Sequence, residues 1–187
     1  PLVMDMSVGT INLSSTMVRT DHRETYPPFS DRATIPLKMK LFTRTNNRVA
    51  HPRELRGQRV AVKEETLYQV TLEEYGGLNI KLYDTDLQAI KDLANGAVDA
   101  FAGSDRTIYY LLRQQGYSNI SAIGTPLRVT SLYFAINLDH PEIQELVNIG
   151  MRNIMANGEY DRIFRKWFVP ELITDEVDAL ITEAQQA

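Results

Sequence analysis

The sequence contains no cysteine, and this absence removes several kinds of chemistry at once. Without cysteine there are no disulfide bonds, no thiolate zinc ligands and no cysteine nucleophile. The chain also lacks an excess of positive charge, since 20 Lys and Arg against 24 Asp and Glu give a formal net charge of -4. Because nucleic-acid-binding domains are usually basic, we expect no nucleic-acid partner.

Long apolar runs and catalytic signatures are missing as well. No apolar stretch approaches the roughly eighteen residues of a membrane-spanning helix. Residues 1–9 lack the basic start and apolar run of a secretory signal, so we expect an exported form to be the mature or trimmed chain. The HExxH, GxSxG, GxGxxG and Walker-type patterns are absent, and the three histidines are scattered. We therefore expect no metal site, no cofactor and no catalytic residues.

The composition that remains is that of an ordinary globular protein. The 187 residues are 43% hydrophobic and 24% charged. A chain of this length forms one large domain or two small lobes. In its first part, residues 2–8 are predicted to form a buried strand that ends at Gly9, and residues 37–42 a half-exposed strand. Residues 11–23 are predicted to form a polar loop, with a short helix within it as the alternative.

A regular alternation of strands and helices follows. The pattern predicts strands over 59–62, 80–83, 98–102 and 120–123, and helices over 66–75, 85–93 and 107–115. Thr85 with Gln88 three residues later is a capping box, and Asn95-Gly96 supplies a left-handed stop. Short connections between alternating elements predict a mainly parallel sheet with right-handed crossovers.

Two extended segments, 36–45 and 129–137, bracket this region, and helices are expected over 141–156 and 160–168. The layout predicts an α/β protein of two lobes with two crossover strands as the hinge. Lobe one comprises residues 1–45 and 129–187, and lobe two comprises residues 46–128. Ligands of such sheets bind outside the carboxyl ends of the strands, here in the cleft between the lobes.

Three motifs in order along the chain resemble those of family 3 periplasmic solute-binding proteins. Residues 54–62 (ELRGQRVAV) resemble the entry to the family's second lobe, residues 83–100 carry its YDT and NGAVDA segments, and residues 157–168 (NGEYDRIFRKWF) resemble its C-terminal motif. The resemblance implies the type II periplasmic-binding-protein fold. The family's first two strand–helix units have no counterpart here, so lobe one is expected to be incomplete, which a trimmed chain, a second chain that completes it, or a reduced variant would explain.

The resemblance also implies a function. It indicates a periplasmic or extracellular protein, not an enzyme, that closes about its hinge on a small amino-acid-like or carboxylate solute for uptake through an ABC permease. One alternative is the ligand-binding sensor domain of a membrane receptor or kinase. Another is a dehydratase-like relative in which Glu65 or Asp105 acts as a general acid. A third is an interaction module that no longer binds a ligand.

In lobe one, the resemblance implies an arginine that binds the carboxylate of the solute. The family uses a Thr-x-x-Arg segment, because a guanidinium offers a planar fork of donors that matches a carboxylate. Two segments fit this pattern, and they end at Arg19 and Arg23. Arg23 stands at the family's distance before Phe29-Ser30-Asp31 and is preferred, with Arg19 as the alternative.

Further lobe-one candidates come from the same resemblance. Ser7, Gly9 and Thr10 lie where the family's first strand ends and presents backbone and hydroxyl groups to the ligand, although a simple turn explains them equally well. Tyr26 and Phe29 are candidates for the wall of the pocket, or alternatively for the core.

In lobe two, the family often carries Gly-Thr-Thr at a helix N-terminus, where backbone amides and the helix dipole attract an anion. The corresponding residues are Glu65, Thr66 and Leu67, so only Thr66 is retained as a donor. The adjacent carboxylates of Glu64 and Glu65 would repel an anion, which indicates a ligand other than a plain α-amino acid. A solvated helix start is the alternative.

The family also places an aspartate after the third strand of lobe two to pair with the ligand's ammonium group. Asp105 lies one residue later than the family's usual aspartate, so Ser104 is the alternative residue at that position. A purely structural role for Asp105 would be the N-cap of the following helix.

Overall fold

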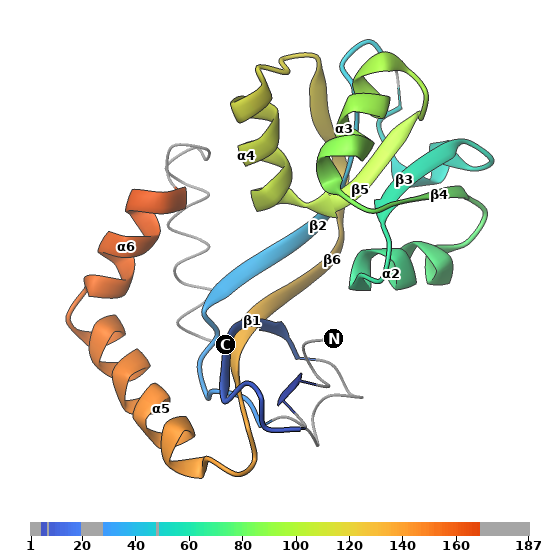
Figure 1. Ribbon diagram of the computed structural model, residues 1–187. Helices are drawn as coiled ribbons and strands as arrows, with labels where there is room; N and C mark the ends of the chain where they lie inside the picture. The colour runs from blue at the N-terminus through green and yellow to red at the C-terminus, as the bar shows by residue number, and fades with distance from the viewer. Residues whose placement is uncertain (1–4, 7, 20–27, 48, 169–187) are drawn as a thin grey trace. The chain divides into compact units, whose positions relative to one another are not determined.

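The computed structural model describes residues 5–6, 8–19, 28–47 and 49–168 (Figure 1). The chain separates into two compact units. Unit 1 comprises Pro1–Pro36 and Thr130–Ala187, and unit 2 comprises Leu37–Val129. Two long strands, β2 (Ile35–Arg44) and β6 (Ile120–Ile136), carry the chain between the units. The assignment of lobes to residues 1–45 with 129–187 and to residues 46–128 remains a prediction.

Unit 2 is built on one sheet with the strand order β6-β2-β5-β3-β4. Within it β3 (Arg59–Lys63) pairs in parallel with the edge strand β4 (Asn79–Tyr83) and with β5 (Ala100–Ser104), while β2 pairs antiparallel to β5. The register sets Lys63 opposite Tyr83 and Val62 opposite Ala102. The carboxyl ends of the three parallel strands therefore lie side by side.

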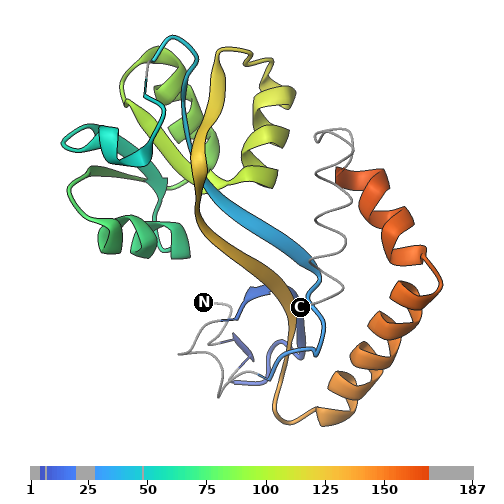
Figure 2. The ribbon, with the colours of Figure 1, turned by 180° about the vertical axis from the view of Figure 1, so that it is seen from behind.

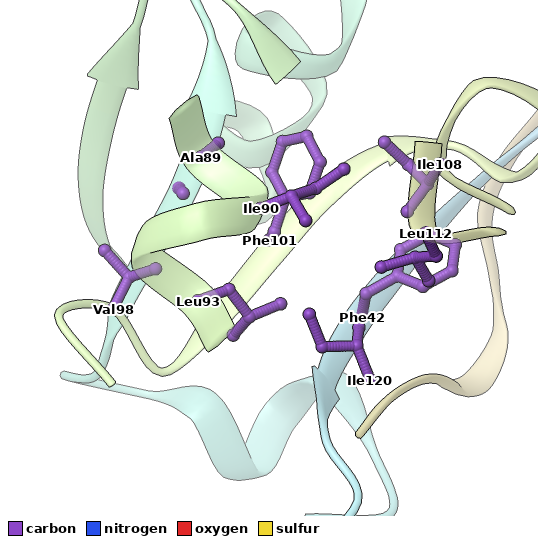
Figure 3. Packing of buried hydrophobic residues seen from close by; sticks show 10 residues of the cluster. Phe42, Ala89, Ile90, Leu93, Val98, Phe101, Ile108, Leu112 and Ile120 are labelled. Carbon is purple, nitrogen blue, oxygen red and sulfur yellow. The ribbon is translucent and has the colours of Figure 1, made fainter. Parts of the chain in front are cut away.

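Helices cover both faces of this sheet. On one face α2 (Leu67–Tyr75) contributes Leu72 to a core with Val60 and Val62. On the other face α3 (Asp86–Asn95) and α4 (Asp105–Gln115) pack on Ala61 and Phe101 (Figure 3). The alternation of Val60, Ala61 and Val62 between the two cores is the period of two expected of a strand that is buried on both faces.

Two helices of unit 2 begin at the N-caps that the sequence indicates, and one of them ends at the predicted glycine. Thr66 and Thr85 are N-caps whose hydroxyls accept the backbone N–H groups of Gln69 and Gln88. Gly96 ends α3 at φ 82°. The predicted N-cap at Thr85 and the left-handed stop at Gly96 are thus confirmed, because both depend only on neighbouring residues. The Gln88 side chain accepts the Thr85 hydroxyl at 3.1 Å, so the second bond of a capping box, to the backbone N–H of Thr85, is not formed.

Arg59 and Asp99 form a close ion pair at the start of β3. The Nε and Nη2 atoms of Arg59 donate to the two carboxylate oxygens of Asp99 at 3.0 and 2.9 Å, and the backbone N–H of Arg59 adds a third bond at 2.9 Å. The hydrogen bonds from the Arg59 side chain hold the pKa of Asp99 below its ordinary value.

We expect the pH dependence of folding to report this pair. Because the pKa of Asp99 is lowered by folding, its contribution to stability is present above the unfolded-state value and is lost as the pH falls through the folded-state value. The stability difference between the native chain and Asp99→Asn should therefore be largest near neutral pH and shrink below about pH 4. Urea unfolding at several pH values measures it, with the exposed Asp84→Asn as control. A difference that does not change with pH would contradict the assignment.

Unit 1 contains β1 (Leu13–Val18), which pairs antiparallel with the C-terminal half of β6, beside which it lies in Figure 2. Two helices follow β6, α5 (Pro141–Ala156) and α6 (Glu159–Phe168), and they share a small core of Met151, Tyr160 and Phe164. The side chains of Gln144 and Tyr160 donate to the backbone oxygens of Phe29 and Thr34 at 2.8 and 2.9 Å, which joins the helices to residues 28–34.

Two expectations for the first residues are wrong. Residues 2–8 were expected to form a strand, but Asp5 and Met6 are helical and a turn follows at residues 8–9. The oxygen of Asp5 accepts the backbone N–H groups of Thr10 and Ile11, and this closes the turn. Residues 11–23 were expected to form a loop, but residues 13–18 form β1, which is a strand because it pairs with β6.

Candidate functional site

Three helices of unit 2 begin at the carboxyl edge of its parallel strands. After β3 the chain enters α2 through residues 64–66, after β4 it enters α3 through residues 84–85, and after β5 it enters α4 directly. We call residues 63–68, 83–86 and 104–106 the strand-end site. Ligands of open α/β sheets bind at edges of this kind, where backbone amides of helix N-termini and strand-end side chains meet.

Thr66 uses its hydroxyl for the fold. The Oγ1 atom accepts the backbone N–H of Gln69 at 3.4 Å and donates to the oxygen of Lys63 at 2.7 Å. The first amides of a helix have no acceptor within that helix. The backbone amides of Leu67 and Tyr68 are therefore better suited to bind an anion than the Thr66 hydroxyl, which is already hydrogen-bonded.

Glu65 occupies a backbone conformation that favours glycine. Its φ is 55°, and it is the one non-glycine residue with positive φ in the described part of the chain. Its backbone N–H donates to Oε1 of Gln69 at 3.0 Å. Glu65 thus has a left-handed backbone, which favours glycine, at the position where the resembled sequences often carry glycine.

Replacing Glu65 by glycine is expected to stabilise the protein by about 0.5–1 kcal/mol. The change relieves a left-handed strain of about 1–2 kcal/mol, and the greater freedom of glycine in the unfolded chain offsets part of that gain. The free energy of unfolding in urea measures the effect.

Glu64→Gly is the matched control, because Glu64 precedes it and does not have a positive φ. This variant should lose stability by up to about 1 kcal/mol. Equal effects at both positions would contradict the strain at Glu65.

Asp105 and Ser104 are buried at the end of β5. Asp105 is 3% exposed, and its Oδ1 atom accepts the backbone N–H groups of Lys38 at 3.3 Å and Arg106 at 2.8 Å. Ser104 is 4% exposed, and its Oγ atom has no hydrogen-bond partner among the described residues. The helix begins at Asp105 and not at residue 107, so Ser104 takes the N-cap position, without a side-chain cap bond. The N-cap role considered for Asp105 is therefore wrong.

Tyr68 and Asp86 belong to the same edge, although the sequence did not single them out. Burial raises the pKa of Tyr68, the nearby Ser104 hydroxyl opposes that rise, and the carboxylates of Asp86 and Asp105 add to it. The Tyr68 and Ser104 hydroxyls are thus neighbours, but not at hydrogen-bond geometry. Burial also raises the pKa of Asp86, and the charge of Lys63 partly opposes this. Asp86 is the first residue of α3, where a carboxylate is common for helix stability alone.

Tyr83, at the end of β4, is a structural donor. Its hydroxyl donates to Oδ2 of Asp92 at 2.7 Å. Burial, followed by this bond, raises the pKa of Tyr83 to about 12. The hydroxyl consequently stays protonated at neutral pH and holds the end of β4 to α3.

The predicted site residues of lobe one are placed differently. Gly9 and Thr10 form an exposed turn, in which the Thr10 hydroxyl donates to the oxygen of Asp5 at 3.0 Å. Phe29 is buried in a core with Met6, Met17 and Ala135. Arg19 is exposed just after β1. Ser7, Arg23 and Tyr26 lie outside the described residues. The structure thus brings together Thr66, Ser104 and Asp105 from the predicted set.

A separate shallow pocket of about 330 Å³ lies in unit 1. Its lining is polar and comes from α5 and Asp31, with an ion pair between Arg152 and Asp31 at 3.6 Å. Among the described residues no group of three or more His, Asp or Glu side chains is arranged to hold a metal ion. No described helix has the length and apolar character needed to cross a membrane.

Known structures share this fold. A mutant of ArgBP from T. maritima superposes with a TM-score of 0.79 at 21% identity, over 90% of this chain and 73% of that one. The fold is that of the type II periplasmic-binding proteins, as the sequence predicted. The model of the bacterial extracellular solute-binding proteins, family 3, matches residues 2–170. The chain belongs to this family.

Curated relatives include binding proteins and a sensor. The arginine-binding periplasmic protein of Mannheimia haemolytica is 26% identical over 58% of this chain and 47% of its own length, and the L-cystine-binding protein TcyA of Bacillus subtilis (strain 168) is 22% identical over 80% and 55%. The virulence sensor protein BvgS of Bordetella bronchiseptica is 28% identical over 63% of this chain and 10% of its own length. The chain spans about half the length of the two curated binding proteins it matches here.

Proposed function

We propose that the chain captures a small amino-acid-like or carboxylate solute outside the cytoplasm, in the periplasm or extracellular space, and presents it to an ABC permease. The observation that carries this proposal is the strand-end site within a chain of the solute-binding family 3. The printed names of the relatives, which include arginine-binding and L-cystine-binding proteins, support an amino-acid-like solute.

The strand-end site offers complementary groups for a zwitterion. The amides at the start of α2 suit a carboxylate, because they are unpaired within the helix and lie at its positive end. The buried carboxylate of Asp105 suits an ammonium group, because a desolvated charge gains most from an opposite charge. In unit 1, Arg23 is proposed as the residue that binds the carboxylate, with Arg19 as the alternative.

A thermal-shift screen of amino acids and small carboxylates tests this proposal. A solute that binds only the folded chain stabilises it by mass action, by about 2.7 kcal/mol at one hundred times its Kd. We expect a shift with at least one amino-acid-like solute, and a loss of that shift in Arg23→Ala but not in Arg19→Ala. A folded chain that shows no shift at millimolar solute would overturn the proposal and favour an interaction module.

A sensor function is the second candidate, because BvgS is among the relatives. Solute capture would be the same in both cases, so the partner distinguishes them. Stimulation of a permease's ATPase by the loaded chain supports transport, whereas solute-dependent kinase activity of a protein that contains this chain supports sensing. We expect the solute to be recovered unchanged, and its dehydration would instead indicate an enzyme.

A further inference from the structure

We infer that Asp86, Ser104 and Tyr68 form a subsite for a positively charged group of the solute, so that the preferred ligand carries a guanidinium or ammonium group besides its α-ammonium. This inference rests on the proposed function and specifies the ligand class. All three residues belong to unit 2.

Asp86 supplies the charge. Its carboxylate is half-buried, and it makes neither a hydrogen bond nor an ion pair with any residue that the structure describes. Burial is the larger influence on this group and disfavours its charged form, while Lys63 only partly compensates. A cation that binds beside this half-buried carboxylate would stabilise its charged form, because partial desolvation strengthens the attraction between the two charges.

Ser104 supplies a second, independent indication. Its side chain points to the same face of the sheet as those of Ala100 and Ala102, four and two residues earlier, and α2 covers that face. There the hydroxyl is buried and without a partner in the described chain. Buried hydroxyls in proteins nearly always have a hydrogen-bond partner, and the N–H groups of a guanidinium or ammonium would provide one.

Tyr68 connects these two groups. It lies in the first turn of α2. Burial raises the pKa of its hydroxyl, Ser104 opposes that rise, and the charges of Asp86 and Asp105 add to it. The Tyr68 hydroxyl therefore lies beside Ser104 and within electrostatic reach of the carboxylates at the ends of β4 and β5, which flank β3 at the same edge of the sheet. Acceptors of this kind in a partly desolvated setting match a charged multiple donor better than a neutral side chain.

A role confined to helix stability does not explain these observations. A carboxylate in the first turn stabilises a helix equally well when it is exposed. Asp84 and Glu64 at the same edge are exposed, as expected of solvated charges. Asp86 is half-buried and has no hydrogen-bond or ion-pair partner among the described residues, and the buried Ser104 hydroxyl at the same edge of the sheet also lacks a hydrogen bond there.

Isothermal titration calorimetry with L-arginine, L-lysine, L-citrulline and L-norleucine tests the inference. Citrulline and norleucine have nearly the shapes of arginine and lysine but uncharged side chains. We expect the cationic amino acids to bind about tenfold or more tightly than their neutral counterparts. In Asp86→Asn this preference should fall to about twofold or less, while affinity for the neutral compounds stays unchanged. Ser104→Ala should weaken cation binding several-fold.

Asp84→Asn is the matched control, since it removes the same charge from the same strand end and should keep the preference. If Asp86→Asn does not fold, the comparison of arginine with citrulline in the native chain still decides. Equal affinity for both, or a preference that survives in Asp86→Asn, would overturn the subsite while leaving the proposed function intact. Binding of neutral or acidic solutes alone would do the same, and the absence of any amino-acid binding would overturn both.

Discussion

Replacing Phe101 by alanine is expected to lower the free energy of unfolding by about 3–5 kcal/mol. Phe101 lies on β5 and is fully buried in a cluster with Phe42, Ile90 and Leu93 (Figure 3). Removal of the ring leaves a cavity between the sheet and the helices α3 and α4. The surroundings can fill it only in part, because the neighbouring side chains are themselves held by the packed core.

Equilibrium unfolding in urea measures this loss. The matched control is Tyr110→Ala on α4, because Tyr110 is an aromatic residue of the same unit that is 52% exposed. We expect that control to change stability by less than about 1 kcal/mol. A loss below about 1 kcal/mol for Phe101→Ala would contradict the close packing of this core.

The sequence predicted the elements of unit 2 well, because their signals are local. Thr66 and Thr85 lie next to the helices that they cap, and Gly96 lies next to the helix that it ends. Local signals do not predict β1. Of its six residues only Met17 is buried, so no alternation of apolar and polar residues marks it as a strand. Its conformation comes from pairing with β6, which is more than one hundred residues away in sequence.

Only part of the candidate site could be predicted, because some of its residues depend on local order and others on long-range packing. Asp105 and Thr66 follow directly after strands, so their place at the carboxyl edge could be predicted from the order of elements. The strand β5 was expected to end at Ala102, but it continues through Ser104, because Met39 of β2 pairs with that residue. The burial of Ser104 and its proximity to Tyr68 depend on how α2 packs on the sheet. No spacing in the sequence encodes that packing.

The second large expected effect is on solute binding. We expect Asp105→Asn to weaken binding of any amino-acid solute by about a hundredfold or more, which corresponds to about 2.7 kcal/mol. The carboxylate is buried, and as proposed it pairs with the α-ammonium group that all amino acids share. Asparagine has nearly the same shape but no charge, so the ammonium group would lose its counter-ion in a desolvated place.

This substitution separates binding from folding. Oδ1 of the introduced asparagine can still accept the backbone N–H groups of Lys38 and Arg106, so we expect stability to change by less than about 1 kcal/mol. Calorimetric titration measures affinity, and Glu64→Gln is the control for loss of charge at the same edge. Unchanged affinity in a folded Asp105→Asn would contradict the role of Asp105. A loss confined to cationic amino acids would assign Asp105 to the side-chain subsite with Asp86, because an α-ammonium partner must affect neutral and cationic ligands alike.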